Sequence, residues 1–276
     1  MKKLTFTSEL SWPRKWLSVL RPRHFRSATQ MVSKEGETID FVSPVHTSGK
    51  NVETWMTEVE NQMLAAVREV IKIGVESYIE LDRTEWVLQQ PGQVCLNSSQ
   101  VHWTAEVEEA IGQAALSGYF EKLSDQLMGL VRLVRGDISK LQRMSIGALI
   151  VIDVHAKDTV EKMAKDNITD VFSFEWISQL RYYWEMDDRN SENLWVRMVQ
   201  TPFPYGYEYL GNSFRLVITP LTDMCYMTLM GAQSLNLGGA PAGPAGTGKT
   251  ETTKDLAKAL AKQCLGRPWK RLSVML

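Results

Sequence analysis

Eight consecutive residues near the end of the printed sequence have the types and the spacing of a phosphate-binding loop. Positions 243–250 read G-P-A-G-T-G-K-T, which matches G-x-x-x-x-G-K-[ST] at every fixed position. In this motif glycines let backbone N–H groups surround phosphates, the lysine reaches the β- and γ-phosphates, and the last hydroxyl ligates Mg²⁺. The predicted phosphate-binding residues are Gly243, Pro244, Ala245, Gly246, Thr247, Gly248, Lys249 and Thr250, with Thr250 also the predicted magnesium ligand.

The residues around this loop support a nucleotide site. Residues 251–262 are rich in good helix formers, so the loop is expected to open onto a helix N-terminus, which favours an anion. Ahead of the loop, residues 214–219 are a strand candidate, and residues 225–236 are a predicted helix. A flexible Gly/Ala/Pro linker contains similar residues, but the complete motif with its helix favours phosphate binding.

A second motif of interest lies at residues 148–155, an apolar run that carries Asp153. Such a run resembles the Walker B strand, whose acid helps to hold magnesium. The run precedes the phosphate loop instead of following it, and its flanks read as helix. Periodicity alone does not separate a buried strand from a buried helix segment, so a metal-binding role for Asp153 is the less favoured interpretation. The three cysteines and four histidines show no metal-ligand spacing.

The elements that must position the loop are mainly helical. Apolar residues recur at steps of three and four over residues 52–70, 104–118, 120–134 and 160–185. We find no β-hairpin signals between these stretches, and residues 31–50 read as a connector. The predicted fold class is therefore mainly α, a helical bundle or rod followed by an incomplete α/β segment that carries the phosphate loop.

Composition sets the domain limits and excludes some partners. Residues 1–30 carry seven Lys or Arg against one acid, so we expect a basic, poorly ordered leader. After this leader we expect a helical region over 31–200. A nucleotide-binding portion follows over 201–276, and it ends in an atypical tail at 265–276. The net charge of −1 argues against a nucleic-acid partner, and no apolar run approaches the roughly 20 residues that span a membrane.

Several longer runs carry a specific family resemblance. Y-G-Y-E-Y-L-G-N at 205–212, L-V-I-T-P-L-T-D at 216–223 and the loop with E-T-T-K-D-L-A behind it resemble the dynein heavy chain. They are similar to the start of its first AAA+ module, the main hydrolytic site of that motor. Runs at 86–94, 147–156 and 174–184 resemble the C-terminal part of the dynein linker. The resemblance covers about residues 32–264, and A-P-A-G at 240–243 is closer to the axonemal branch.

This resemblance implies roles that the spacing does not show. Residues 149–155 are expected to be helical, which removes the Walker B interpretation of Asp153. Leu221 and Thr222 are expected beside the adenine of ATP, while Lys249 and Thr250 take the phosphate and magnesium roles. The implied function is an ATP-driven, minus-end-directed microtubule motor of cilia and flagella. The implied partners are dynein intermediate and light chains and microtubules, and the implied location is the cytoplasm and cytoskeleton, in the axoneme.

The printed sequence supplies only part of such a motor. No acid after Lys249 ends an apolar strand, so we expect no Walker B carboxylate, stalk or microtubule-binding domain, and no complete catalytic site. The chain is therefore expected to be a fragment or short isoform that binds nucleotide weakly, if at all, and is not a competent ATPase alone. The alternative is a non-catalytic, linker-type interaction protein that docks onto dynein or its partners. An unrelated ATPase or kinase is disfavoured by the linker similarity.

Overall fold

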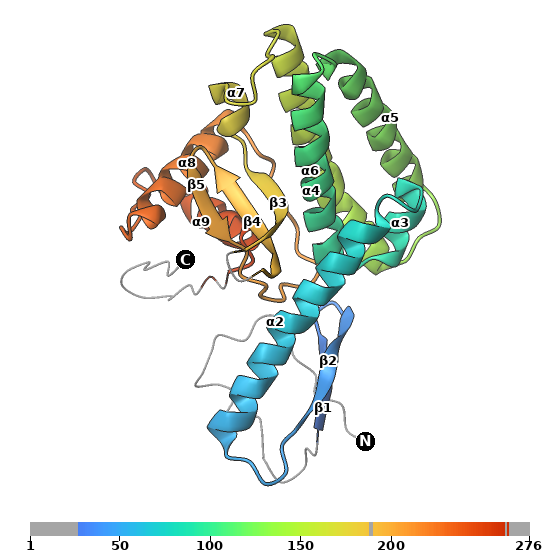
Figure 1. The fold of residues 1–276 in the computed structure, drawn as a ribbon, viewed down its shortest axis with the longest axis vertical. Helices are drawn as coiled ribbons and strands as arrows, with labels where there is room; N and C mark the ends of the chain where they lie inside the picture. Colours follow the sequence, from blue (N-terminus) through green and yellow to red (C-terminus); the bar gives the residue numbers. More distant parts are fainter. Residues whose placement is uncertain (1–26, 188–189, 263, 265–276) are drawn as a thin grey trace.

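The computed structural model describes residues 27–187, 190–262 and 264 of the chain (Figure 1). Helices account for most of it, which confirms the predicted fold class. The elements in chain order are β1 (Ser27–Val32), β2 (Thr38–His46), α2 (Val52–Ser77), α3 (Arg83–Gln89), α4 (Gly92–Gly112), α5 (Leu116–Arg135), α6 (Lys140–Lys165), α7 (Phe174–Ile177), β3 (Arg181–Met186), β4 (Glu192–Met198), β5 (Thr201–Pro204), α8 (Pro220–Ser234) and α9 (Lys249–Ala259).

The helices α4, α5 and α6 pack side by side, and α2 extends away from them (Figure 1). The turn between α5 and α6 is followed by a capping box, in which Ser139 accepts from the Gln142 backbone and Gln142 accepts in return. The buried core between these helices includes Trp103, Val107 and Val160. The predicted helices near 52–70 and 120–134 are confirmed, and α4 begins at Gly92, before the predicted start at residue 104.

Residues 27–46 form an antiparallel hairpin that lies along α2 (Figure 1). The prediction of a connector over 31–50 was therefore wrong, as was the inclusion of residues 27–30 in a poorly ordered leader. Gly36, with φ of +92°, makes the turn possible, and Met31, Ile39 and Phe41 are buried on the helix side. The Gly, Ser and Pro content of this stretch conceals its alternating pattern. The rest of the predicted leader, residues 1–26, lies outside the described residues, as do tail residues 265–276.

A second correction concerns residues 160–185, which were predicted to stay helical. Helix α6 ends at Lys165, and after the single turn of α7 the chain enters β3. The three strands β3, β4 and β5 form an antiparallel sheet in that order, with Tyr182 opposite Val196 and Val196 opposite Phe203. Aromatic residues favour strands, and alternating burial along the sheet replaces the helical stripe. The expectation of no β-hairpin was wrong.

The sheet separates two groups of helices. Strand β3 contacts α4, and strand β5 contacts α8, which in turn contacts α9 (Figure 1). The sheet continues across residue 200, and the division of the chain at that position stays a prediction. Within the part of the chain that the structure describes, no helix is long and apolar enough to cross a membrane.

The predicted strand at residues 214–219 does not form. This segment has neither helical nor strand structure, and the side chains of Phe214 and Val217 are mostly exposed. A strand needs a neighbour to pair with, and no described residue forms a ladder with this segment. The predicted helix that follows is confirmed as α8. It begins at Pro220 behind a capping box formed by Thr219 and Thr222.

Candidate nucleotide-phosphate site

The backbone of the predicted phosphate loop has the conformation that its glycines permit. Gly243, Gly246 and Gly248 have φ angles of +150°, +80° and +77°, a region that residues with a Cβ rarely adopt. Gly248 is also the N-cap of α9, so the loop leads directly into a helix at Lys249. The loop itself is exposed to solvent. The sequence motif therefore corresponds to a turn that ends at the positive end of a helix.

Lys249 folds back over the loop. Its Nζ donates to the Gly243 carbonyl at 2.9 Å and to Thr247 Oγ1 at 3.0 Å, and it also contacts the Pro244 carbonyl. Thr247 Oγ1 in turn donates to the Pro244 carbonyl at 2.9 Å. A Cβ placed on Gly243 would lie 3.9 Å from this Nζ, an ordinary contact distance, so the φ of +150° and not a lack of space is what favours glycine there. The loop thus holds a cation within a glycine-lined turn, as a phosphate site requires.

The first turn of α9 places Thr250 directly after this lysine. Thr250 is half-buried, and the helix N-terminus in which it lies leaves backbone N–H groups available to an anion. Further along the helix, the Thr253 hydroxyl donates to the Lys249 carbonyl at 2.9 Å. Glu251 pairs with Lys254 on the outer face of the helix. The magnesium role of Thr250 stays a prediction, and its position in the motif is the one that role requires.

The two residues predicted to lie beside adenine differ in their surroundings. Leu221 is 75% exposed at the start of α8, so its side chain is available for contact with a flat base. The hydroxyl of Thr222 lies 2.9 Å from that of Thr219 and is part of the helix cap. A contact from Thr222 would therefore involve its methyl group or a shared hydroxyl. The adenine roles of both residues remain predictions.

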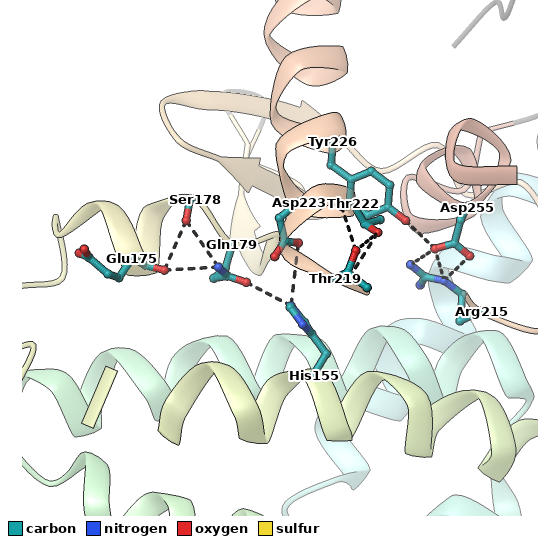
Figure 2. Close-up of polar contacts among 10 residues, drawn as sticks. All are labelled: His155, Glu175, Ser178, Gln179, Arg215, Thr219, Thr222, Asp223, Tyr226 and Asp255. Carbon is teal, nitrogen blue, oxygen red and sulfur yellow. Dashed lines mark hydrogen bonds and ion pairs between the residues drawn. The ribbon is translucent and has the colours of Figure 1, made fainter. Parts of the chain in front are cut away.

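Behind the loop, α9 carries a buried carboxylate that the sequence reasoning missed. Asp255 accepts from Arg215 Nε at 3.1 and 3.2 Å and from Arg215 Nη2 at 3.0 Å. It also accepts from the Tyr226 hydroxyl at 2.7 Å (Figure 2). The Leu216 amide donates to it at 3.1 Å. Burial alone raises the pKa of Asp255, but the guanidinium and the hydrogen bonds outweigh it and lower that pKa. Asp255 and Leu216 lie in runs that carried the family resemblance, but the sequence analysis assigned no role to either residue.

Asp153 is separate from the phosphate loop. It lies in the middle of α6, where its carboxylate forms a buried ion pair with Arg83 at 2.8 Å. The expectation that residues 149–155 are helical is confirmed. The buried position that made Asp153 resemble a metal ligand is explained by this partner instead.

A polar contact joins α6 to the first turn of α8. His155 Nε2 lies 3.1 Å from Gln179 Oε1 and 4.0 Å from Asp223 Oδ1 (Figure 2). Both groups line a cavity of about 20 Å³, which is room for roughly one water molecule. Burial lowers the pKa of His155 and raises the pKa of Asp223 to about 6.

The segment 205–212 anchors α9 to the helical part of the chain. Tyr205 accepts from Gln93 and Asn97 of α4, and Tyr209 donates to Glu37 in the β1–β2 turn at 2.8 Å. The backbone amides of residues 206 and 208 donate to the carbonyls of residues 260 and 261, at the end of α9. The run of tyrosines that carried the family resemblance is therefore a set of tertiary anchors.

Comparison with known proteins identifies two family models in this chain. The model described as "Hydrolytic ATP binding site of dynein motor region" matches residues 205–267, which include the phosphate loop and Asp255. The model described as "Dynein heavy chain, N-terminal region 2" matches residues 1–74, so the similarity begins earlier than residue 32.

Curated relatives extend this similarity over most of the chain. The chain is 54% identical over 237 residues to dynein axonemal heavy chain 3 of Homo sapiens, covering 85% of this chain and 6% of the relative. It is 56% identical over 236 residues to dynein axonemal heavy chain 1 of Mus musculus, covering 85% of this chain and 5% of the relative. It is 52% identical over 239 residues to dynein axonemal heavy chain 12 of Rattus norvegicus, covering 85% and 8%.

The chain thus spans less than a tenth of the length of these relatives. The two family models leave residues 75–204 between them, and the relatives match over 85% of the chain. The alternative of a separate, linker-type interaction protein is not favoured by these matches, because they include the ATP-binding region itself. The chain belongs to the dynein heavy-chain family.

Proposed function

We propose that residues 243–250 bind the phosphates of ATP with a magnesium ion. The observation that carries this proposal is the loop geometry: three glycines at positive φ lead into a helix N-terminus, with the Lys249 ammonium folded over them. The match to a family model of a dynein ATP-binding site supports it independently. The donor set is a lysine, backbone amides and a threonine hydroxyl, which suits polyphosphate and a hard cation.

Within this site each residue has a distinct task. Lys249 exchanges its loop carbonyls for phosphate oxygens, a stronger, charge-assisted interaction. Thr250 provides a hydroxyl to magnesium, whose chemistry is to neutralise charge on the phosphates. Leu221 and Thr222, on the first turn of α8, contact the adenine.

For the whole protein, we propose the role that its relatives' names indicate, that of an axonemal dynein heavy chain. In this role the chain contributes an ATP-binding site to a microtubule motor of the cilium or flagellum. Its proposed partners are the other dynein chains, including intermediate and light chains, and microtubules. Support comes from identity above 50% to three axonemal heavy chains over 85% of the sequence.

Binding of Mg-ATP to the purified chain tests the site. We expect saturable binding by isothermal titration calorimetry that Lys249→Ala weakens by about tenfold to a hundredfold, the value of one or two hydrogen bonds to a charged group. Lys254→Ala is the matched control, since Lys254 lies on the same helix but pairs with Glu251 on its outer face. Removal of magnesium with a chelator should weaken binding in the wild type. Equal affinity in the wild type and Lys249→Ala would refute the site.

A further inference from the structure

The ion pair between Arg215 and Asp255 is the most deeply buried charged contact near the phosphate loop. The two side chains are 6% and 1% exposed, and their shortest contact is 3.0 Å. Asp255 has acceptor sites for about four hydrogen bonds, and Arg215, Tyr226 and the Leu216 amide satisfy them. These hydrogen bonds fix the carboxylate of Asp255 in a single orientation.

This carboxylate joins three separate pieces of the candidate site. Asp255 lies on α9, six residues after Lys249 and therefore about 9 Å along the helix axis. Tyr226 lies on α8, whose first turn carries Leu221 and Thr222. Arg215 and Leu216 lie in the irregular segment ahead of α8. Figure 2 shows Tyr226 and Arg215 converging on Asp255 from these two sides.

Stability alone does not explain the use of charges here. A buried ion pair is often no more stabilising than well-packed apolar residues of similar size, because both charges lose their water. Its distinctive property is directional: the planar guanidinium and the carboxylate fix distance and angle together. The pair lies between α9, which follows the phosphate loop, and α8, which carries the predicted adenine contacts. A fixed distance and angle at this point would therefore affect a ligand that contacts both helices.

We propose that Asp255 and Arg215 are positioning residues that set the distance between the phosphate loop and the first turn of α8, so that one nucleotide reaches both. This inference rests on the proposed function, because it assumes that phosphates bind at residues 243–250 and adenine at α8. Neither side chain touches the nucleotide. Their loss should affect ligands that need both halves of the site, and spare ligands that need only the loop.

The test compares Mg-ATP with magnesium tripolyphosphate, which has no base, on the full chain. For Asp255→Asn we expect the affinity for ATP to fall by about tenfold and that for tripolyphosphate by less than about twofold. Tyr226→Phe removes one hydrogen bond to Asp255 without creating an unpaired charge. It should lower the ratio of the affinity for ATP to the affinity for tripolyphosphate in the same direction, by a smaller factor. This second variant keeps the test informative if Asp255→Asn does not fold.

Asp153→Asn is the matched control. It also removes the carboxylate partner of a buried arginine, since Arg83 and Asp153 are 11% and 10% exposed. The ion pair that it breaks joins α6 to α3, and neither of its residues lies on α8 or α9. It should leave the ratio of the two affinities unchanged. If Asp255→Asn and Tyr226→Phe reduce both affinities equally, the positioning role is wrong while the phosphate site stands. If the wild type binds neither ligand through Lys249, the proposed function fails, and this inference fails with it.

Discussion

The contact between α6 and α8 leads to a prediction about pH, because the Asp223 carboxyl is partly buried without a close cationic partner. Its side chain is 20% exposed, and His155 approaches it only to 4.0 Å. Burial raises the pKa of Asp223 from its ordinary 3.8 to about 6. A folded-state pKa above the unfolded value means that the folded chain binds the proton more tightly. This contribution to stability is therefore fully present below about pH 4 and is lost as the pH rises through about 6.

The size of this effect follows from the shift. A rise from 3.8 to about 6 corresponds to about 3 kcal/mol at full burial. Since solvent still reaches part of the carboxyl, we expect about 1–3 kcal/mol. Replacement of Asp223 by Asn removes the ionisable group and keeps the shape. The variant should thus gain stability relative to the wild type between about pH 4 and pH 7 by this amount.

His155 must be removed from the comparison, because burial lowers its pKa. Its contribution to the stability of the protein is therefore lost as the pH falls, which is opposite in sign to the contribution of Asp223. We therefore specify the measurement in a His155→Gln background, in which glutamine retains a polar group near Gln179. The assay is urea unfolding followed by tryptophan fluorescence, with and without Asp223→Asn, at several pH values. A difference that is flat with pH, or that favours the aspartate near pH 7, would show that the carboxylate is well solvated and refute the reasoning.

Two further predictions concern contacts away from the loop. Asp153→Asn should lower the free energy of unfolding by about 3–5 kcal/mol by leaving the Arg83 charge buried without its carboxylate partner, and the double variant Arg83→Met/Asp153→Leu should recover most of that loss in urea unfolding. Gly206→Ala should cost about 1–3 kcal/mol in the same assay, since its Cβ would lie 2.4 Å from the Ala261 carbonyl oxygen, a backbone atom that cannot rotate away. Gly118→Ala is the control, because nothing lies within 4 Å of a Cβ there; equal losses at both glycines would contradict this explanation.

Local chemistry was predictable from the sequence. The phosphate loop depends on glycines at 243, 246 and 248 and on the helix behind them, all within a dozen residues, and the structure has that backbone. The long helices α2 and α5 were predictable for the same reason, since an amphipathic stripe repeats every turn. Helix α8 was predictable from its apolar residues, and its start at Pro220 follows a cap that is readable at Thr219.

Strands were not predictable in the same way. Residues 214–219 have the composition of a strand but no described neighbour to pair with. Strand β3 pairs with β4, although its apolar residues also fit the steps of three and four that predicted a helix over 160–185. Pairing is a property of two segments, and a single segment carries only half of the information. The hairpin at residues 27–46 was missed for a related reason, because its burial depends on α2.

The same distinction applies to the candidate site. The motif residues lie at the exposed end of α9, where a ligand can reach them, but the orientation of that helix is decided at its other end. There Asp255 binds Arg215 from 40 positions away, and the carbonyls of residues 260 and 261 receive amides from residues 206 and 208. These contacts could not be predicted from a local sequence pattern, because the two partners of each contact lie far apart in the sequence and meet only in the folded chain. The sequence motif thus predicts which residues can bind phosphate, whereas the orientation of those residues toward a nucleotide depends on the contacts of the buried half of α9.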